Sequence, residues 1–151
     1  MLNAVLTFKR VLVPVDFSEL SETVLDYGVG LTDSEGVTIV VHVLEPLPMH
    51  FESAFGSFVN TEGLVRIREN AEKLLEDLKK RYSASKLVTE LREGKPQHQV
   101  LEAAKDHAAE IIVQGSHGRG GLEALFLGSV AAKILRKAEC PVLTVRHPRR
   151  K

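Results

Sequence analysis

Glycine residues gather in one stretch of the chain that could bind a phosphate group. Four of the 11 glycines fall between Gly115 and Gly121, and glycine lets backbone N–H groups approach an anion closely. Gly128 and Ser129 then open a helix-like segment, whose first N–H groups lack helical partners and carry partial positive charge. A phosphate suits such a place, and the Ser129 hydroxyl could donate to it or cap the helix. The pattern predicts phosphate binding, with an ordinary surface loop as the alternative.

This glycine-rich stretch differs from two widespread phosphate-binding motifs. No Gly-Lys-Ser/Thr follows the glycines, as it would in a P-loop. A long insertion separates Gly118 from Gly128, which departs from the dinucleotide-binding fingerprint. The residues therefore point to a phosphate site of another kind.

Other residues that could carry chemistry each have a structural alternative. Asp16 could bind a ribose or a phosphate-bound Mg²⁺, or serve only as a carboxylate at the start of a helix. Arg119 could clamp a phosphate or remain solvated, and His117 is more typical of a loop residue than of an acid–base group. His42 falls inside a strand and is expected to be a hydrogen-bonded core histidine. Cys140 is expected to be a small buried hydrophobe.

Neither catalytic nor metal-binding spacing is evident. No Ser-His-Asp or Cys-His arrangement is supported by spacing alone. The remaining histidines show no metal-ligand spacing with Cys140 or with a carboxylate cluster; they are His50, His98, His107 and His147. We therefore expect no catalytic residue and no metal site.

Strand-like and helix-like patterns alternate along the chain. Apolar, β-branched runs predict strands, and apolar residues at helical spacing predict the helices between them; the strands are expected at 11–15, 37–44, 86–92, 110–114 and 141–145, and the helices after Ser18, at 61–81, over 100–108 and over 130–138. This order predicts an α/β protein with a mostly parallel sheet and helices on both faces.

The alternation also suggests where a ligand would bind. In such sheets ligands bind beyond the carboxyl ends of the strands, where the winding direction reverses. If the first strand neighbours the fourth, the turn at Asp16 faces the loop that begins at Gly115. Val43 ends the second strand at the same edge of the sheet. There its side chain could pack against an adenine, and its backbone amide could form a hydrogen bond with the edge of the base.

Length and composition restrict the class of protein. The chain has 151 residues, of which 44% are hydrophobic and 26% charged, so we expect one globular domain over residues 1–151 with its core at about 9–146. Lys plus Arg and Asp plus Glu are 20 each, which disfavours nucleic acid as the main partner. No apolar run approaches the ~18 residues of a membrane span, and no signal peptide is evident. With one cysteine, a cytoplasmic location is the expectation.

From about Lys9 to Arg146 the sequence resembles the universal stress protein family. The most specific match is the spacing Gly-x2-Gly-x9-Gly-Ser, which marks the ATP-binding branch of that family. Three further segments carry the resemblance: the opening strand and acidic turn, the end of the second strand, and the last strand with its approach. The matching residues are Arg10 to Ser18, Val41 to Val43, Gly115, Gly118, Gly128, Ser129, and Ala138 to Val145.

The resemblance implies a fold, a ligand and an assembly. The fold would be a three-layer sandwich around a five-stranded parallel sheet in the order 3-2-1-4-5. The protein would be a stress-response regulator that binds ATP, with any Mg²⁺ held mainly by the phosphates, and a homodimer through its last strand, Pro141–Val145.

The resemblance also assigns the binding residues. Pro14, Val15 and Asp16 would lie beside the adenosine, and Val43 would contact adenine through its backbone. The phosphates would be wrapped by Gly115, Ser116, His117, Gly118 and Arg119 and would meet the helix N-terminal amides of Gly128, Ser129 and Val130. One departure is Gln114, where a small or apolar residue is commoner; its side chain would crowd the site or add a hydrogen bond.

Two other functions remain open at this point. One is a slow ATPase or self-phosphorylating protein, with Ser18, Ser116 or Ser129 as acceptors, although the loop holds no phosphate-stabilising lysine and no evident base for water. The other is an interaction module that keeps the fold without binding a nucleotide.

Overall fold

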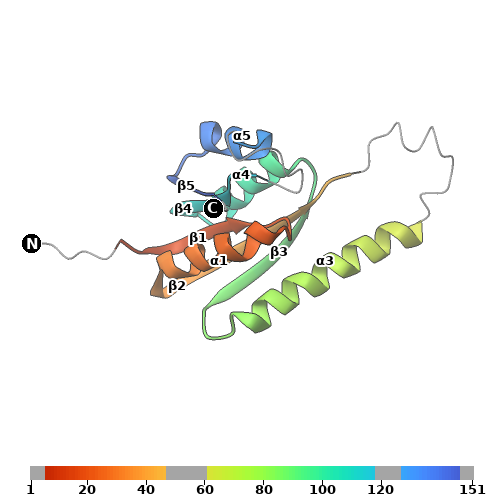
Figure 1. Ribbon diagram of the computed structural model, residues 1–151, viewed down its shortest axis with the longest axis horizontal. Coiled ribbons are helices and arrows are strands. Elements are labelled where there is room, and N and C mark those ends of the chain that lie inside the picture. The colour runs from red at the N-terminus through yellow and green to blue at the C-terminus, as the bar shows by residue number, and fades with distance from the viewer. Residues whose placement is uncertain (1–5, 47–60, 118–126, 147–151) are drawn as a thin grey trace, which may run out of the picture.

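Strands and helices alternate along the chain, and the computed structural model describes residues 6–46, 61–117 and 127–146 (Figure 1). The strands in this part are β1 (Phe8–Pro14), β2 (Thr32–Leu44), β3 (Leu87–Glu93), β4 (Ile111–Gly115) and β5 (Val142–Val145). The helices in the same part are α1 (Glu19–Leu31), α3 (Thr61–Arg81), α4 (Pro96–Asp106) and α5 (Ser129–Lys137).

The five strands form one parallel sheet in the order β3-β2-β1-β4-β5. This confirms the expected fold class and strand order. β1 lies in the middle, with β2 on one side and β4 on the other. The winding direction reverses between β1 and β4, which is the position where open α/β sheets bind ligands.

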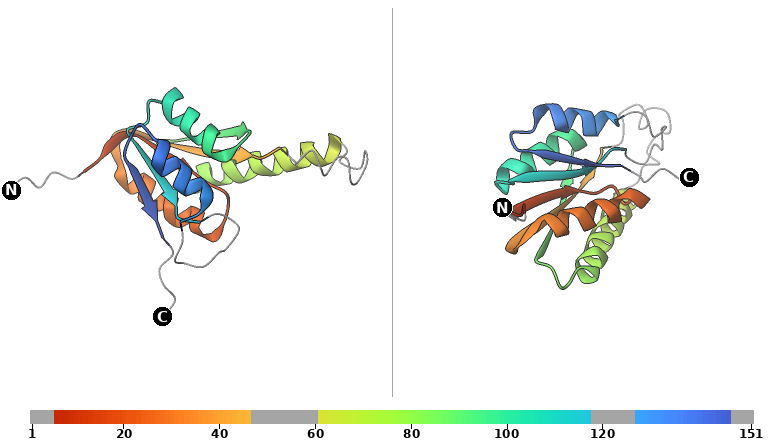
Figure 2. Two further views of the ribbon diagram at one scale, coloured as in Figure 1. Left: turned by 90° about the horizontal axis from the view of Figure 1, so that it is seen from above. Right: turned by 60° about the vertical axis from the view of Figure 1, so that its left-hand side comes forward.

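The helices cover both faces of the sheet (Figure 2). Because side chains of a strand alternate between faces, Val11 and Val13 join a core cluster with α1 and α3, while Leu12 joins a second cluster with α4 and α5. All three valine and leucine side chains have 0% exposure. The β-branched runs seen in the sequence are therefore strands buried on both faces, as expected for a parallel sheet.

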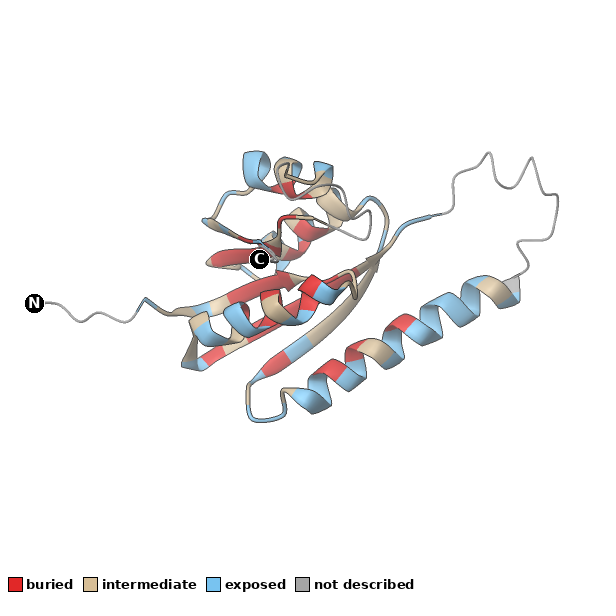
Figure 3. Cartoon of the chain, viewed as in Figure 1, coloured by how far each residue is buried: buried red, intermediate tan, exposed pale blue. Residues whose placement is uncertain are grey.

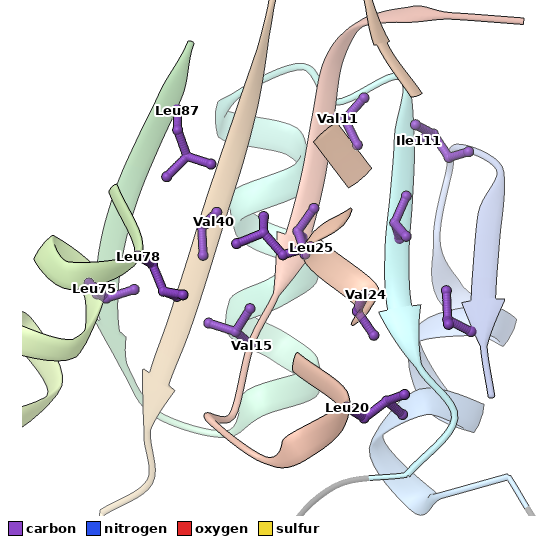
Figure 4. Packing of buried hydrophobic residues seen from close by; sticks show 13 residues of the cluster. Val11, Val15, Leu20, Val24, Leu25, Val40, Leu75, Leu78, Leu87 and Ile111 are labelled. Atoms are coloured by element: carbon purple, nitrogen blue, oxygen red, sulfur yellow. The ribbon is translucent and has the colours of Figure 1, made fainter. Parts of the chain in front are cut away.

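Packing on the α1 face joins helices that are far apart in the sequence (Figure 4). Leu75 and Leu78 of α3 pack against the same cluster as Val40 of β2, and Leu25 of α1 packs against it from the side of β1. This cluster sets the position of α3 over the sheet, and hence of the α3 residues near the carboxyl ends of the strands.

The second strand begins earlier than the sequence predicts. A strand was expected at 37–44, but β2 already begins at Thr32. Its pairing with β1 is irregular there, since Phe8 pairs with Thr32 and Arg10 with Val37. A Cβ on Gly36 would lie 2.9 Å from the carbonyl oxygens of Phe8 and Lys9, so glycine lets the irregular strand stay close to β1.

The apolar stripe of α3 is buried over only part of its length. Ala71, Leu75 and Leu78 are buried, as expected for a core stripe, whereas Leu64 is 48% and Ile67 50% exposed. Figure 3 shows the N-terminal half of α3 largely exposed, beyond the body of the sheet. Helical periodicity defines which residues share a face, but the length of the sheet decides how many of them it covers.

Across the described ranges, no helix combines the length and the apolar content that crossing a bilayer requires.

Candidate functional site

A cavity of about 830 Å³ lies over the edge of the sheet where β1, β2 and β4 end. Most of the residues predicted from the sequence line it, namely Pro14, Val15, Asp16, Val43, Gly115, His117, Gly128, Ser129 and Val130. Ser116 is buried and does not belong to the lining. Gly118 and Arg119 lie outside the described residues.

The lining comes from both faces of the sheet edge. On the α1 face it includes Val15, Leu20 and Val24. The other face is lined by Gln114 and a set of apolar residues, which we call the α5-side lining: Val41, Val43, Pro96, Val100, Val130, Ala131 and Ile134. An apolar wall with a few polar groups is the usual make-up of a small-molecule site.

The turn after β1 fixes the carboxylate of Asp16 at the cavity wall. Asp16 Oδ1 accepts hydrogen bonds from the Ser18 N–H and the Ser21 hydroxyl, both at 3.0 Å. The Asp16 N–H donates to Ser21 Oγ at 3.3 Å. Ser18 occupies the expected N-cap position of α1, but its side chain makes no capping hydrogen bond. Asp16 therefore stabilises the start of α1 and is held in place by it.

A second contact ties the end of β2 to the same turn. His42 is buried, and its Nδ1 lies 2.8 Å from the carbonyl oxygen of Val15. Its ring centroid is 4.5 Å from that of Phe17, which follows Asp16 and has a φ of 60°. Positive φ is uncommon for a bulky residue and is stabilised by surrounding structure. The expectation of a hydrogen-bonded core histidine is confirmed, and its bond supports the cavity wall.

The backbone of Val43 is directed toward the end of β1. The Val15 N–H donates to the carbonyl of Val41 at 2.9 Å, so the backbone groups of Val41 face β1. Backbone groups of residues two apart in a strand face the same side, so those of Val43 do too. β1 ends at Pro14, which pairs with Val41; Val43 therefore directs its backbone groups past the end of β1.

Ser116 joins the end of β4 to the start of α5. Its N–H donates to the carbonyl of Val145 at 2.8 Å, and its carbonyl accepts the N–H of Gly128 at 2.7 Å. Its hydroxyl lies 2.7 Å from Nδ1 of His117. The other ring nitrogen of His117, Nε2, is buried, and no residue in the described part of the chain forms a hydrogen bond with it. Ser116 thus positions α5 and His117.

The N-terminus of α5 forms part of the cavity wall. Gly128 is the N-cap residue, and its carbonyl accepts the Ala132 N–H at 2.8 Å. The sequence predicted that the amides of Gly128, Ser129 and Val130 all point to the phosphates. The Gly128 N–H already donates to the Ser116 carbonyl, so the prediction holds at most for Ser129 and Val130. The N–H groups of Ser129, Val130 and Ala131 belong to the first turn and have no acceptor within the helix.

Gln114 is a buried polar side chain beside the apolar residues of the α5-side lining. It is 2% exposed, and its Nε2 donates to the carbonyl of Ala131 at 3.0 Å and to Oγ1 of Thr144 at 3.2 Å. The longer polar side chain therefore joins β4 to α5 and β5. Its Oε1 is buried and has no hydrogen-bond partner within the described ranges.

The described lining contains carboxylates and two histidines but neither lysine nor arginine. Asp16 and Glu45 line the cavity, and neither lysine nor arginine does so within residues 6–46, 61–117 and 127–146. In this part of the chain, favourable interactions with an anion come from backbone N–H groups and the dipole of α5. Within the same ranges, no group of three or more His, Cys, Asp or Glu is placed to hold a metal ion.

Comparison with known proteins establishes the family. The family model described as the universal stress protein family matches residues 7–146. The chain belongs to the universal stress protein family.

Individual members of the family match along nearly the whole length. Universal stress protein MJ0531 of Methanocaldococcus jannaschii is 30% identical over 146 residues, which cover 95% of this chain and 85% of the relative. The solved structure of MJ0577 from the same organism superposes with a TM-score of 0.81 at 28% identity, covering 95% of this chain and 99% of the other. The order of strands and helices described above is thus that of a universal stress protein.

Two further solved universal stress proteins share this fold and hold adenine nucleotides. One is a complex with cAMP, at 19% identity and a TM-score of 0.65, covering 94% and 99% of the two chains. The other, from Archaeoglobus fulgidus, is a complex with dAMP, at 22% identity and a TM-score of 0.60, covering 91% and 97%.

Several lining residues of this universal stress protein were not predicted from its sequence. Ser21 lies in the first turn of α1 and orients Asp16, and Pro96 and Val100 of α4 contribute to the apolar wall. Ile67 and Leu74 of α3 also line the cavity. The helical spacing of the α3 residues was visible in the sequence, but it indicates burial without saying against which surface.

Proposed function

We propose that this universal stress protein binds an adenine nucleotide, ATP in the first instance, in the cavity over the sheet edge. In this proposal the bound nucleotide changes the conformation or partners of a homodimer, and the protein acts as a regulatory switch. The main support for this proposal is that the first turn of α5 and a mostly apolar wall line the same cavity.

The phosphates would lie at the N-terminus of α5. The first-turn N–H groups of Ser129 and Val130, together with the helix dipole, favour an anion there. His117 adds a donor: when the Ser116 hydroxyl donates to Nδ1, the hydrogen of the neutral ring is on Nε2, which has no partner among the described residues. Any Mg²⁺ would be held mainly by the phosphates.

The base would lie against the α5-side lining, beside Val43. Charge-assisted hydrogen bonds contribute about 1.5–3 kcal/mol each, whereas association costs roughly 4–15 kcal/mol. Three or four phosphate contacts therefore only balance the cost of binding, and burial of the base must supply the rest. The backbone groups of Val43, directed past the end of β1, are suited to the edge of such a base.

Two relatives support an adenine nucleotide as the ligand. The cAMP and dAMP complexes show that proteins of this fold accommodate an adenine ring with a sugar and a phosphate. The present chain has N–H donors in the first turn of α5 and an apolar wall in the α5-side lining. These features favour binding of a nucleotide over an interaction module that uses the same edge only for packing.

The dimer would form through the outer edge of β5. β5 lies at the end of the sheet and pairs with β4 on one side, and Leu143 on this strand is 36% exposed. An edge strand with an apolar residue favours pairing with another strand. Light scattering after size-exclusion chromatography should give the mass of two chains, and Leu143→Lys should give the mass of one.

Calorimetric titration tests the binding proposal. Protein freed of carried-over nucleotide should give saturable heat with Mg-ATP, at one nucleotide per chain, and weaker binding with adenosine. Phosphate release measured over hours in the same samples should stay at background if the protein is a switch. Absence of saturable heat with any adenine nucleotide would overturn the proposal.

A further inference from the structure

The buried amide of Gln114 has one end satisfied and one end unsatisfied. Nε2 donates to the Ala131 carbonyl and to Oγ1 of Thr144. Oε1 is buried and has no hydrogen-bond partner among residues 6–46, 61–117 and 127–146, and the residue as a whole is 2% exposed. Leaving a buried acceptor unpaired costs free energy, so this atom calls for a partner that the described residues do not supply.

The orientation of this amide is fixed by its surroundings. Exchanging the two ends would place Oε1 against the carbonyl oxygen of Ala131, and two acceptors cannot form a hydrogen bond. The partner that satisfies Oε1 must therefore be a donor, an N–H or an O–H group. Phosphate oxygens are acceptors and do not meet this requirement.

The place of Gln114 in the cavity indicates which part of a ligand would supply the donor. Gln114 lies on β4 directly before Gly115, and its side chain shares the sheet face of the α5-side lining. That lining is otherwise apolar, so an unsatisfied acceptor is a specific polar feature of a wall suited to a nucleoside. A small number of placed polar groups is what gives such pockets their specificity.

We propose that Gln114 is a specificity-determining residue, whose Oε1 accepts a hydrogen bond from a donor on the nucleoside of the bound nucleotide. This inference rests on the proposed function. The donor is either the exocyclic amino group of adenine or the ribose 2′-hydroxyl, and both present the same chemistry to the amide oxygen.

Two ATP analogues distinguish the sources of the donor. ITP carries an oxygen in place of the amino group, and 2′-deoxy-ATP lacks the 2′-hydroxyl. The wild-type protein should bind one of these two analogues about fivefold or more weakly than ATP, because Oε1 is then left buried without a donor. Weaker binding of ITP assigns the amino group, and weaker binding of 2′-deoxy-ATP assigns the hydroxyl.

Gln114→Met tests whether the amide causes the discrimination. Methionine has a similar length without the acceptor, so in this variant the ratio of the affinities for ATP and the discriminated analogue should fall from its wild-type value toward one, apart from the discrimination that the Val43 backbone supplies. Gln97→Met makes the same chemical change on α4 outside the cavity lining and should keep the wild-type ratio. A wild-type ratio in Gln114→Met, or equal affinities for all three nucleotides in the wild type, overturns the inference and leaves nucleotide binding intact.

A measurement on the wild type covers the case in which Gln114→Met does not fold. The ¹³Cδ resonance of Gln114 should move downfield on addition of ATP and should not move with the analogue that lacks the donor. No movement with saturating ATP means that water or nothing satisfies Oε1, and the inference fails. If neither ATP nor its analogues bind, the proposed function fails first and this inference fails with it.

Discussion

His42 Nδ1 lies 2.8 Å from the carbonyl oxygen of Val15, across the gap between the ends of β2 and β1. A carbonyl oxygen only accepts hydrogen bonds, so Nδ1 carries the hydrogen and the tautomer of His42 is set by this contact. The same ring contacts Phe17. The side chain of His42, which belongs to β2, thus contacts both the end of β1 and the turn that follows it. It joins these three parts of the cavity wall.

Replacing His42 should therefore reduce both stability and nucleotide affinity. His42→Leu removes the donor for the buried Val15 carbonyl, which should lower the free energy of unfolding by about 1–3 kcal/mol. Affinity for ATP should fall in the same variant because the turn at Asp16 loses a support. His98→Leu makes the same change at an exposed position of α4 and should stay within about 0.5 kcal/mol of the wild type. Equal denaturation midpoints for the two variants would contradict this role.

Two glycines of α1 should respond to alanine in opposite directions. A Cβ on Gly28 would lie 2.4 Å from Cγ2 of Val13, which is fully buried in the core, whereas nothing lies within 4 Å of one on Gly30. Gly28→Ala should lower the free energy of unfolding by about 1–3 kcal/mol, because α1 must move away from β1. Gly30→Ala should raise it by about 0.5–1 kcal/mol, because alanine favours the helix. Urea denaturation of both variants checks the pair, and a shared sign would contradict the close packing at Gly28.

An ionic network away from the cavity should contribute to stability in a pH-dependent way. Burial alone would raise the pKa of Glu90, but hydrogen bonds from His107 and Arg92 outweigh it and hold the pKa below its usual value. A lowered pKa in the folded state means stability that is present above the unfolded value and is lost as the pH falls. Glu90→Gln should therefore cost about 0.5–1 kcal/mol at neutral pH, since the pair is partly exposed.

The difference between Glu90→Gln and the wild type should disappear in acid. As the pH falls below the ordinary glutamate pKa of 4.5, the wild-type carboxylate takes up a proton and comes to resemble glutamine. Glu139→Gln removes a carboxylate that is 76% exposed and should change stability little at any pH. Denaturation at a series of pH values measures both variants; a gap that stays constant down to pH values well below 4.5 would show that charge is not the cause.

The fold could be predicted well because the central strands stand out in the sequence as short apolar runs. Val11 to Val13 are apolar and β-branched or leucine, and all three are fully buried, so their burial on two faces follows from composition alone. The start of β2 could not be predicted, because Ser34-Glu35-Gly36 has the composition of a turn. Its strand conformation depends on pairing with β1, which no local pattern reveals.

The candidate site was predictable where glycine and helix-start signals coincide, and less so elsewhere. Gly128 and Ser129 mark the start of α5 in the sequence and in the structure. The bond from the Gly128 N–H to the Ser116 carbonyl joins residues twelve positions apart, and periodicity gives no information on such contacts. The hydrogen-bond partners of Gln114 on α5 and β5 could not be predicted for the same reason. The sequence showed only that a polar residue stands where a small or apolar one is commoner.

Ser129→Asp should separate phosphate binding from folding. Ser129 is exposed, lines the cavity and is the first residue of α5. A carboxylate at a helix N-terminus is favourable by about 0.3–1 kcal/mol, so stability should be unchanged or slightly raised. The same carboxylate would repel a polyphosphate. Two like unit charges 4 Å apart repel by about 4 kcal/mol at an effective dielectric constant of 20. We expect affinity for ATP to fall at least about tenfold, which corresponds to ~1.4 kcal/mol.

Adenosine is the matched ligand for this variant because it has the base and sugar of ATP but no phosphate. Ser129→Asp and the wild type should bind adenosine equally, and Ser129→Ala should bind ATP with only a small loss, since the backbone N–H groups remain. Calorimetry with both ligands distinguishes the outcomes. If adenosine loses affinity as much as ATP does, the substitution has damaged the cavity; if ATP loses none, its phosphates do not lie at the N-terminus of α5.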